Sequence, residues 1–421
     1  MTIDILVFVN GDFHNDPRVN RAVRFMGQFG YQLIVASGLT KGPIPSPKDY
    51  EWGRVHYLRV FKAGQISWSL PFTRFAETPS KKTNSKSSET IGSQPSWYKR
   101  LFKSLLYLSQ LLNFLQLNLR LIIRYYRLDV KLYYPNDIDV AVAAAVLAWI
   151  HKKPLLYETH EFHVDQSAAH PAWYRRVIMA LEGWVAKRST NMIVVGNCIA
   201  QAIRRQYQLD TQPVVIKNCP PFQQVTKSSD IELPFKLLYH GVYQPKRGLE
   251  QVILAMHHID EAHLYLRGYG YWEKPLHNLV TAEDLEDRVT FFPPVPMQTL
   301  VTEAAPFDVG VGAFQGVNLS SRYCLPNKVF EYMMAGLALA VSDLPELHRV
   351  VDDYGVGVTF DPADPEDIAR KINSMLDNPD VLHQMQRRSL KAAREVFNFE
   401  AEGKKLQKIV EDIIGLPTPK N

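Results

Sequence analysis

The sequence predicts an α/β protein made of two doubly wound domains with Rossmann-like parallel sheets. First, a chain of 421 residues is longer than one hydrophobic core usually organises, which favours two domains of roughly 200 residues each. Second, short apolar strands alternate with helical patterns, as in parallel sheets built from strand–helix–strand crossover units. Third, this series of strands begins a second time after a stretch rich in proline and serine.

In the first half of the chain, the expected strands are IDILVFVN, YQLIVAS, PLLYETH, NMIVVG and PVVIKN. In the second half, they are KLLYHG, HLYLRG, RVTFFP, DVGVGAF and LALAVSD, separated by helical stretches such as GLEQVILAMHHI. The stretch between the two series, PPFQQVTKSSDIELPF, has the prolines, serines and mixed charges of an interdomain linker. We therefore predict a first domain at residues 1–225, a linker at 226–235, a second domain at 236–395 and a C-terminal helix within 396–421.

One region fits neither series of strands. Its first part, residues 77–95, is polar and of low complexity, which is typical of a mobile surface loop. An amphipathic helix is expected at about residues 97–126, because apolar residues there recur at steps of three and four. Basic side chains surround it: Lys99, Arg100, Lys103, Arg120, Arg124, Arg127 and Lys131. This pattern is compatible both with a helix resting on an anionic membrane surface and with a helix packed on its own sheet.

Composition excludes several classes of protein. Only 3 cysteines are present, too few and too scattered for a disulfide framework or a cysteine-rich metal site. The N-terminus lacks the basic region and cleavage site of a signal peptide, and no run of about 20 apolar residues predicts a membrane span. The net charge of +5 is mild. We expect a cytoplasmic protein, peripheral on the inner face of the membrane if the basic helix binds lipid.

The loops that follow strands are the first places to look for a site, because open α/β sheets bind ligands at the carboxyl ends of their strands. After the first strand, Gly11 would let backbone approach a ligand, and Asp16 and Arg18 could bind polar groups, although a plain turn is the alternative. After PLLYE come His160 and Glu161. Their spacing identifies no third ligand, so we do not expect a metal site.

The second domain offers an electropositive corner. Lys246 and Arg247 precede Gly248 at the start of a helix, where two cations beside free N–H groups suit a diphosphate. Gly268 and Gly270 follow the next strand and are a weak signal alone. These loops would converge on one crevice.

The stretch CLPNKVFEYMMAGLALAVSD places Glu331 one turn into a helix that begins at Pro-Asn and ends at Gly336. An acidic group there can simply complement the helix dipole, or it can bind a ligand. A carboxylate suits a ligand with paired hydroxyl groups, because it only accepts hydrogen bonds and can take two donors at once.

Taken in order, several of these stretches resemble the family-4 retaining nucleotide-sugar glycosyltransferases of the GT-B fold. They are DPRVNRAVRFMGQFGYQLIVAS, YETHEFH, LEGWVAKRSTNMIVVGNCIAQAIRRQY, VVIKNCP, YHGVYQPKRGLEQVILAM, LRGYG and LPNKVFEYMMAGLALAVSDLPEL, and they span nearly the whole chain. The resemblance implies two Rossmann-like domains facing a central cleft, with the nucleotide sugar on the second domain and most of the acceptor on the first. It also implies a C-terminal helix that crosses back to the first domain.

The resemblance further implies roles for single residues. Glu331 would hold the ribose hydroxyls, Arg247 would stabilise the departing diphosphate, and His160 would orient the donor sugar and acceptor. The expected donor-binding residues are Gly11, Lys246, Gly248, Gly268, Gly270, Asn327, Lys328 and Glu331. The expected acceptor-side residues are Asp16, Arg18 and Glu161.

Two positions depart from the family pattern. The first acid of the Glu-x7-Glu motif would stand at Tyr323, and Val242 occupies the place of a usual arginine. The group that replaces the acid is open, and either Lys246 or Lys328 could supply the missing cation.

The implied reaction is retaining transfer of a hexosyl group from a nucleoside-diphosphate sugar, expected to be a UDP-sugar, to an acceptor hydroxyl. A glycan or lipid-linked acceptor in cell-surface polysaccharide or glycolipid synthesis is expected, and nucleic acid is not. We expect no cofactor or metal, because no Asp-x-Asp follows a strand. The alternatives are a nucleotide-sugar epimerase of the same fold and a non-catalytic GT-B scaffold protein.

Overall fold

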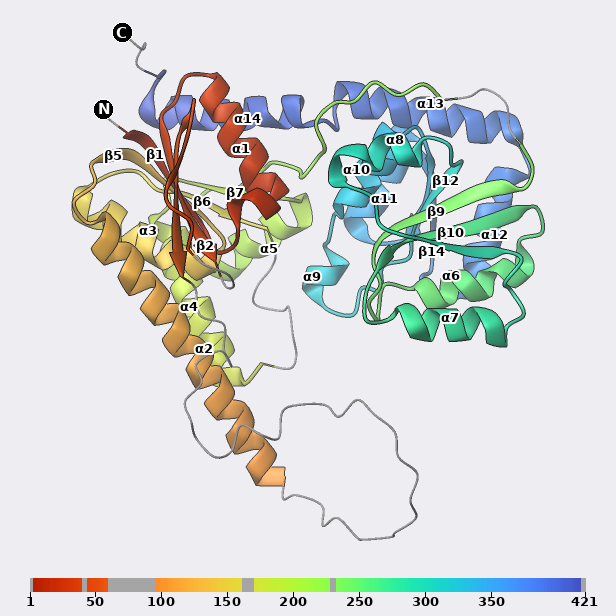
Figure 1. Ribbon diagram of the computed structural model, residues 1–421, viewed down its shortest axis with the longest axis horizontal. Helices are drawn as coiled ribbons and strands as arrows, with labels where there is room; N and C mark the ends of the chain where they lie inside the picture. The colour runs from red at the N-terminus through yellow and green to blue at the C-terminus, as the bar shows by residue number, and fades with distance from the viewer. Residues whose placement is uncertain (1–2, 40–43, 60–95, 161–169, 228–231, 418–421) are drawn as a thin grey trace.

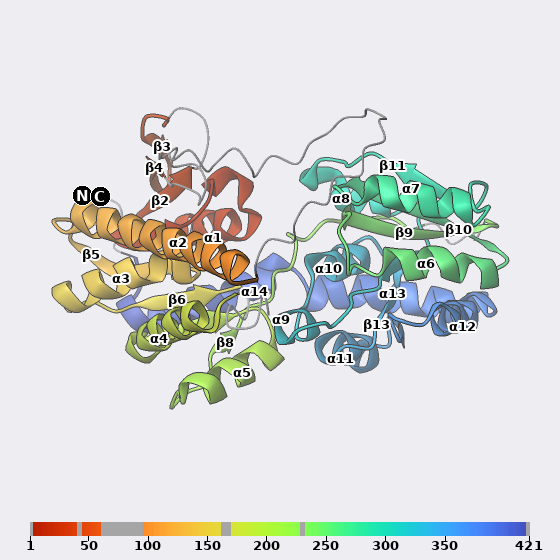
Figure 2. The same ribbon diagram turned by 90° about the horizontal axis from the view of Figure 1, so that it is seen from below.

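The computed structural model describes residues 3–39, 44–59, 96–160, 170–227 and 232–417. Two α/β domains lie side by side (Figures 1 and 2). Each is organised around a largely parallel sheet, so the predicted fold class is confirmed.

The sheet of the first domain has the strand order β3-β4-β2-β1-β5-β6-β7-β8. All neighbours pair in parallel except β3, which is antiparallel to β4. The strands are β1 (Ile3–Val9), β2 (Leu33–Leu39), β3 (Lys48–Tyr50), β4 (Gly53–Arg59), β5 (Val130–Asn136), β6 (Leu156–Thr159), β7 (Asn191–Val194) and β8 (Val214–Val215). The helices are η1 (Phe13–Asn15), α1 (Pro17–Gln28), α2 (Ser96–Tyr125), α3 (Ile138–His151), α4 (Ala172–Arg188) and α5 (Asn197–Tyr207).

The second sheet has the order β11-β10-β9-β12-β13-β14, the arrangement of a doubly wound dinucleotide-type fold. Its strands are β9 (Phe235–Val242), β10 (Ala262–Tyr269), β11 (Val289–Phe292), β12 (Val309–Gly312), β13 (Ala338–Ser342) and β14 (Gly357–Phe360). Its helices are α6 (Leu249–Ala255), η4 (Met256–His258), α7 (Glu273–Ala282), η5 (Met297–Thr299), α8 (Leu300–Ala304), α9 (Leu319–Arg322), α10 (Asn327–Met334), α11 (Pro345–Tyr354) and α12 (Pro365–Leu376).

Two C-terminal helices connect the domains. α13 (Pro379–Glu395) packs on the second domain, and α14 (Phe399–Ile414) lies along the first, as Figure 1 shows in blue. Leu406 and Val410 of α14 are buried in the core that contains β1. Asn398, between the two helices, caps α14 by accepting a hydrogen bond from Ala401 N at 2.8 Å. The chain thus returns to the domain in which it began.

Some elements differ from those expected from the sequence. β3, β4, β5 and β14 are strands that the sequence patterns did not identify. β5 begins a few residues after the long apolar helix α2. The change from the helical repeat of apolar residues to the alternation of a strand is therefore short and easily missed. The polar stretch predicted at 77–95 lies outside the described residues.

Candidate active site

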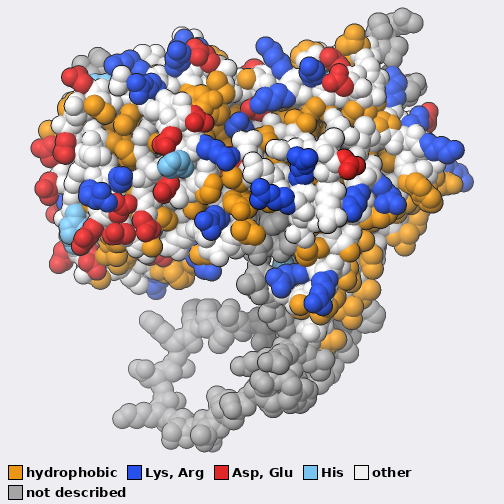
Figure 3. Space-filling model, turned by 180° about the vertical axis from the view of Figure 1, so that it is seen from behind, with side chains coloured by type: hydrophobic (Ala, Val, Ile, Leu, Met, Phe, Trp, Pro, Cys, Tyr) orange, Lys and Arg blue, Asp and Glu red, His pale blue; other side chains and the backbone are white. Residues whose placement is uncertain are grey.

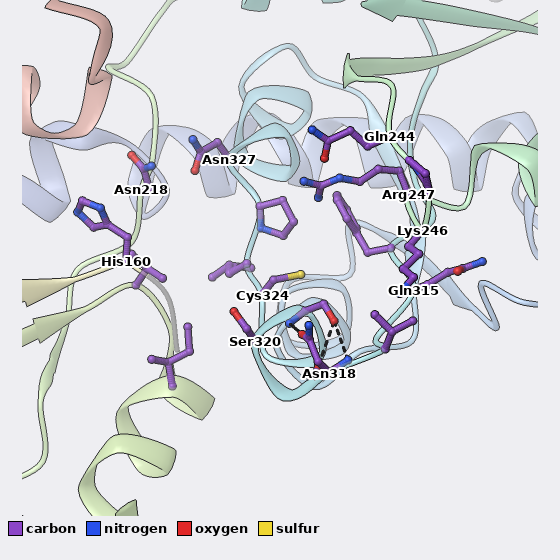
Figure 4. Close-up of a pocket in the computed structure, with 18 residues that line it drawn as sticks. His160, Asn218, Gln244, Lys246, Arg247, Gln315, Asn318, Ser320, Cys324 and Asn327 are labelled. Carbon is purple, nitrogen blue, oxygen red and sulfur yellow. Dashed lines mark hydrogen bonds between the residues drawn. The ribbon is translucent and has the colours of Figure 1, made fainter. Parts of the chain in front are cut away.

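A cavity of about 620 Å³ lies between the two domains, at the carboxyl ends of their strands. On the first domain it is lined by residues that follow β6, β7 and β8, and on the second by residues that follow β9 and β12. The strand order of the second sheet reverses between β9 and β12, which is the place where such sheets bind ligands. Figure 4 shows His160 and Asn218 on one side, facing Gln244, Lys246, Arg247 and Gln315 on the other.

The loop after β9 supplies the cations of the second domain. Lys246 and Arg247 both line the cavity, and Lys246 is exposed. Gly248 has a φ of +67°, and a Cβ there would lie 1.9 Å from the carbonyl oxygen of Ala313. Only glycine therefore lets the loop close on β12. Among the described residues, no carboxylate forms an ion pair with either cation, so both charges remain available to an anionic ligand.

Lys328 is a third basic residue close to Arg247, but it is not among the residues that line the cavity. Its Nζ lies 3.6 Å from the centre of the Tyr239 ring and 5.2 Å from that of Phe314, which Arg247 also approaches. Burial first, and then the charge of Arg247, hold the pKa of Lys328 well below its usual value. The negative charge of a bound diphosphate would offset the repulsion by Arg247, raise this pKa and favour the charged lysine.

Glu331 lies one turn further along α10 and pairs with a buried histidine. His240 Nε2 donates to Glu331 Oε2 at 2.8 Å, while His240 Nδ1 has no partner among the described residues. Burial lowers the pKa of His240, which keeps the ring neutral. Burial opposes ionisation of Glu331, but the hydrogen bond from His240 outweighs it and lowers the pKa of Glu331. The pair therefore fixes an ionised carboxylate whose other oxygen can accept further donors.

On the first domain, two carboxylates hold His160. Its Nδ1 lies 3.1 Å from Asp137 and its Nε2 lies 3.1 Å from Glu158, so both nitrogens face acceptors. Asp137 also accepts from the backbone N of His160 at 2.9 Å. Burial opposes the charged ring, but Asp137 and then Glu158 outweigh it and raise the pKa of His160 to about 10. His160 is an imidazolium at neutral pH.

Glu158 is itself held by the interior of the domain. It is 2% exposed and accepts hydrogen bonds from Arg18 Nε and Tyr134 Oη. Burial opposes its ionisation, but the charge of Arg18 and the donors around it lower its pKa to about 2. The predicted acceptor contact of Arg18 is therefore replaced by a structural role, because its guanidinium is buried and also donates to the Ile216 carbonyl at 3.0 Å.

Other predicted residues lie in several places. Asp16 caps α1 by accepting from the backbone N of Arg18 and Val19, and Asn327 lines the cavity. Gly11 lies in the loop two residues after the end of β1 and is not among the residues that line the cavity. Glu161 lies outside the described residues.

Gly268 and Gly270 do not line the cavity within the described part of the chain. A Cβ on Gly268 would lie 1.9 Å from the carbonyl oxygen of Gly241, and one on Gly270 would lie 2.2 Å from that of Tyr243. Both glycines are needed for the close approach of β10 to the backbone that ends β9.

Tyr323 stands where the family pattern has an acid. Its side chain is partly buried against the hydrophobic core of the first domain, so it packs between the domains. The polar residues next to it on the cavity wall are Asn318, Ser320 and Ser321, which the sequence patterns did not single out. Asn318 and Ser321 form a capping box on α9, with Asn318 Oδ1 accepting from Ser321 N at 2.7 Å. An Asn followed by Ser three residues later was the signal for this small helix.

The described residues contain no group of three or more His, Cys, Asp or Glu side chains that could hold a metal ion.

Comparison with known proteins identifies the second domain. Residues 223–395 match the family model described as glycosyl transferases group 1. No curated protein sequence matches the chain significantly.

Solved structures resemble the whole chain. Sucrose-phosphate synthase from Thermosynechococcus elongatus is 17% identical with a TM-score of 0.71, over 97% of this chain and 98% of that one. HepE from Anabaena, in complex with UDP, is 15% identical with a TM-score of 0.65, over 98% and 100%. A trehalose-6-phosphate protein from E. coli, bound with UDP-2-fluoro glucose, is 9% identical with a TM-score of 0.65, over 98% and 99%. The chain therefore has the two-domain fold of GT-B glycosyltransferases, and residues 223–395 match the glycosyl transferases group 1 model.

Proposed function

We propose that the protein is a retaining glycosyltransferase that moves a hexosyl group from a UDP-sugar to an acceptor hydroxyl. The observation that carries this proposal is the pair of cations on the cavity wall, Lys246 and Arg247, which have no carboxylate partner among the described residues. Lys328 shares the Phe314 ring with Arg247, and the ionised Glu331 follows on the same helix, although neither is among the residues that line the cavity. Cations and a hydroxyl-accepting carboxylate match the diphosphate and ribose of a nucleotide sugar. HepE, which shares the fold, binds UDP-glucose, and this supports UDP as the nucleotide.

In this proposal the two ends of the nucleotide bind to different residues. Glu331 accepts the ribose hydroxyls with the oxygen that His240 leaves open. Arg247 and Lys246 face the diphosphate across the cavity, where negative charge increases as the bond to the sugar breaks. Positive charges fixed in place before the reaction stabilise that departure without reorganising.

His160 then orients the transferred sugar and the acceptor. With a pKa of about 10, its ring is already protonated at neutral pH and cannot act as a general base. The acceptor proton needs another destination, and the departing phosphate oxygen is the available base on the same face of the sugar. This route retains the anomeric configuration.

The acceptor is proposed to be a glycan or a lipid-linked saccharide in cell-surface polysaccharide or glycolipid synthesis. The first-domain wall of the cavity carries Asn218 and Val195, on the side where this proposal places the acceptor. The Asn218 side-chain oxygen accepts from Arg21, which fixes its amide group.

The test is a panel of nucleotide sugars offered with mixed glycan and lipid-linked acceptors, with products detected by mass. We expect a mass increase of one hexose on an acceptor with a UDP-sugar, and nucleotide release that depends on the acceptor. Conversion of the donor sugar without an acceptor would indicate an epimerase instead. Donor binding without any product across the panel would favour a scaffold, the reading that Tyr323 in place of an acid suggests.

A further inference from the structure

Helix α2 has an unusual distribution of apolar side chains. One face packs on α3 and the sheet, with Phe114, Leu117, Leu121 and Tyr125 buried in the core of the first domain. A second set of large apolar side chains on the same helix is exposed. It consists of Leu105, Leu108, Leu112, Leu115, Leu119, Ile123 and Tyr126, which directly follows the helix, and we call this set the leucine stripe.

The leucine stripe is one continuous face. Its members follow one another at steps of three and four residues, as neighbours on one side of an α-helix do. At 3.6 residues per turn, its centre lies about 150° around the helix from the buried face. Leu112 and Leu119 are each 57% exposed and Ile123 is 69% exposed. Isolated exposed leucines are common, but a continuous stripe of this size indicates a surface that binds something apolar.

The charged residues beside the leucine stripe indicate what kind of surface it binds. Arg120, Arg124 and Arg127 are exposed and follow the same helical spacing along one flank. α2 contains no Asp or Glu. Figure 3 shows hydrophobic side chains along the described part of this edge of the molecule, with basic side chains next to them. Leucines bordered by arginines are complementary to a bilayer surface that carries anionic headgroups.

The contacts of α2 with α3 favour a helix that lies on a membrane surface over one that crosses the membrane. Residues Ser104–Tyr125 are long and apolar enough to span a bilayer by length and composition, which the sequence patterns did not indicate. However, Asn118 is buried and joins α2 to α3, donating to the Asp139 carbonyl at 2.8 Å and accepting from Ala143 N at 2.7 Å. Spanning would expose these groups to hydrocarbon, whereas lying flat leaves them undisturbed.

At the C-terminal end of α2, α3 adds further apolar surface. His151 approaches the Tyr126 carbonyl with its Nε2 at 2.9 Å, so the ends of the two helices are adjacent. Trp149, two residues before it, is 71% exposed, and Ile150 is 38% exposed. A Trp with its ring exposed is favoured at the boundary between headgroups and hydrocarbon.

We propose that the leucine stripe of α2 inserts into the surface of an anionic bilayer, with its arginines at the headgroups. This goes beyond the proposed transfer reaction, because it concerns where the chain docks and does not depend on catalysis. A second copy of the chain is a less suitable occupant, since an antiparallel twofold contact through the stripe would bring two basic flanks together. Docking there would hold the enzyme beside lipid-linked molecules.

The experiment is co-flotation of the full chain with vesicles of phosphatidylcholine alone and with phosphatidylglycerol added. We expect the wild-type chain to float with the anionic vesicles. The triple variant Leu112→Gln, Leu115→Gln and Leu119→Gln should bind at least about tenfold more weakly, because three side chains lose their apolar transfer energy. A matched control replaces three exposed apolar residues elsewhere with Gln, namely Ile44, Met297 and Leu416, and should bind like the wild type.

A second set of variants separates charge from insertion. Replacing Arg120, Arg124 and Arg127 with Gln should weaken binding to anionic vesicles several-fold and reduce its dependence on salt. The same change at Lys391, Lys404 and Lys408, which are exposed on α13 and α14, should have no such effect.

Three results would overturn the proposal. One is a wild-type chain that stays unbound with anionic vesicles at low salt. Another is a leucine-stripe variant that floats as well as the wild type. The third is a dimer in light scattering that the leucine-stripe variant dissociates, with no vesicle binding, since the stripe would then join two copies. None of these readouts uses transferase activity, so they are independent of the proposed function.

Discussion

The two walls of the cavity hold their charges in opposite ways. On the first domain, His160 contacts Asp137 and Glu158, and Glu158 in turn contacts Arg18 and Tyr134, so each of these charges already has a partner. On the second domain, Lys246 and Arg247 face the cavity without a carboxylate partner among the described residues.

This difference indicates which wall binds the charged part of a ligand and which wall positions the reacting groups. A charge already paired inside the protein has little left to gain from a ligand, and its geometry is rigid. A cation that faces an empty cavity gains most of its electrostatic stabilisation when an anion arrives. We therefore assign diphosphate binding to the second domain and the orientation of the sugar and acceptor to the first. Each prediction below tests one part of this division.

The largest effect is expected at Arg247. Arg247→Ala should lower turnover by about a hundredfold or more, while the affinity for the nucleoside changes little, because the arginine acts on charge that develops during bond breaking. Steady-state kinetics with the active donor, together with binding of uridine, would measure this. Arg387→Ala removes an exposed arginine on α13 and serves as the control. Normal turnover in Arg247→Ala would show that the diphosphate is held elsewhere.

The next effect is expected at the ribose site. Glu331→Gln should weaken binding of the nucleotide sugar by roughly 1–3 kcal/mol, because an amide accepts at one oxygen only and leaves a poorly matched donor. Titration calorimetry with UDP would measure the change. The control is Glu283→Gln. Glu283 also contacts a histidine, since His257 Nε2 lies 3.0 Å from its carboxylate, but it stands at the C-terminal end of α7 and does not line the cavity. Equal UDP affinity in a folded Glu331→Gln variant would contradict the proposed role.

The sequence could indicate the second wall better than the first. Arg247 belongs to a loop that ends at a glycine, and Glu331 belongs to a helix start. Each of these patterns consists of a few consecutive residues. The partners of His160 come from two separate strand ends, and Asp137 follows β5, which was not recognised as a strand. Contacts between strand ends depend on the order of strands in the sheet, which no local pattern contains.

The sequence interpretation of Arg18 failed for a different reason. Asp-Pro at residues 16–17 is a typical helix start, with Asp16 as N-cap and Pro17 at the first helical position. The sequence interpretation had Arg18 binding polar groups of a ligand, whereas the side chain is buried and donates to Glu158 in the interior. The helix-start signal was present and would have placed Arg18 in the first turn of a helix, but the contact with Glu158 depends on the order of strands.

A smaller effect, visible only against pH, tests the first wall. The pKa of His160 is raised to about 10, so the ring stays charged throughout the neutral range and activity should not fall until more alkaline pH. Asp137→Asn removes one of the two carboxylates and should move this alkaline limit down by roughly 1–3 pH units. Asn is suited to this position, because Asp137 has a φ of +64°, which Asn tolerates better than most residues.

The measurement is kcat against pH for the wild type and Asp137→Asn. Asp352→Asn is the matched control, because Asp352 is also one of two carboxylates that contact a histidine, His348, but on the exposed surface of α11. Its pH profile should match that of the wild type. An unchanged profile for Asp137→Asn would mean that the charge of His160 does not matter to the reaction.

The smallest effect, no change at all, is expected from removing divalent ions. If the cations of the second wall neutralise the diphosphate, a metal ion has no charge left to balance there, and turnover should survive an excess of EDTA. Kinetics with and without the chelator, using a water-soluble acceptor so that ions bound to lipid cannot interfere, would measure this. Loss of turnover with EDTA, restored by magnesium or manganese, would mean that Lys246, Arg247 and Lys328 do not suffice. The contrast between a wall that binds charge and a wall that positions substrates would then need a metal ion on the binding side.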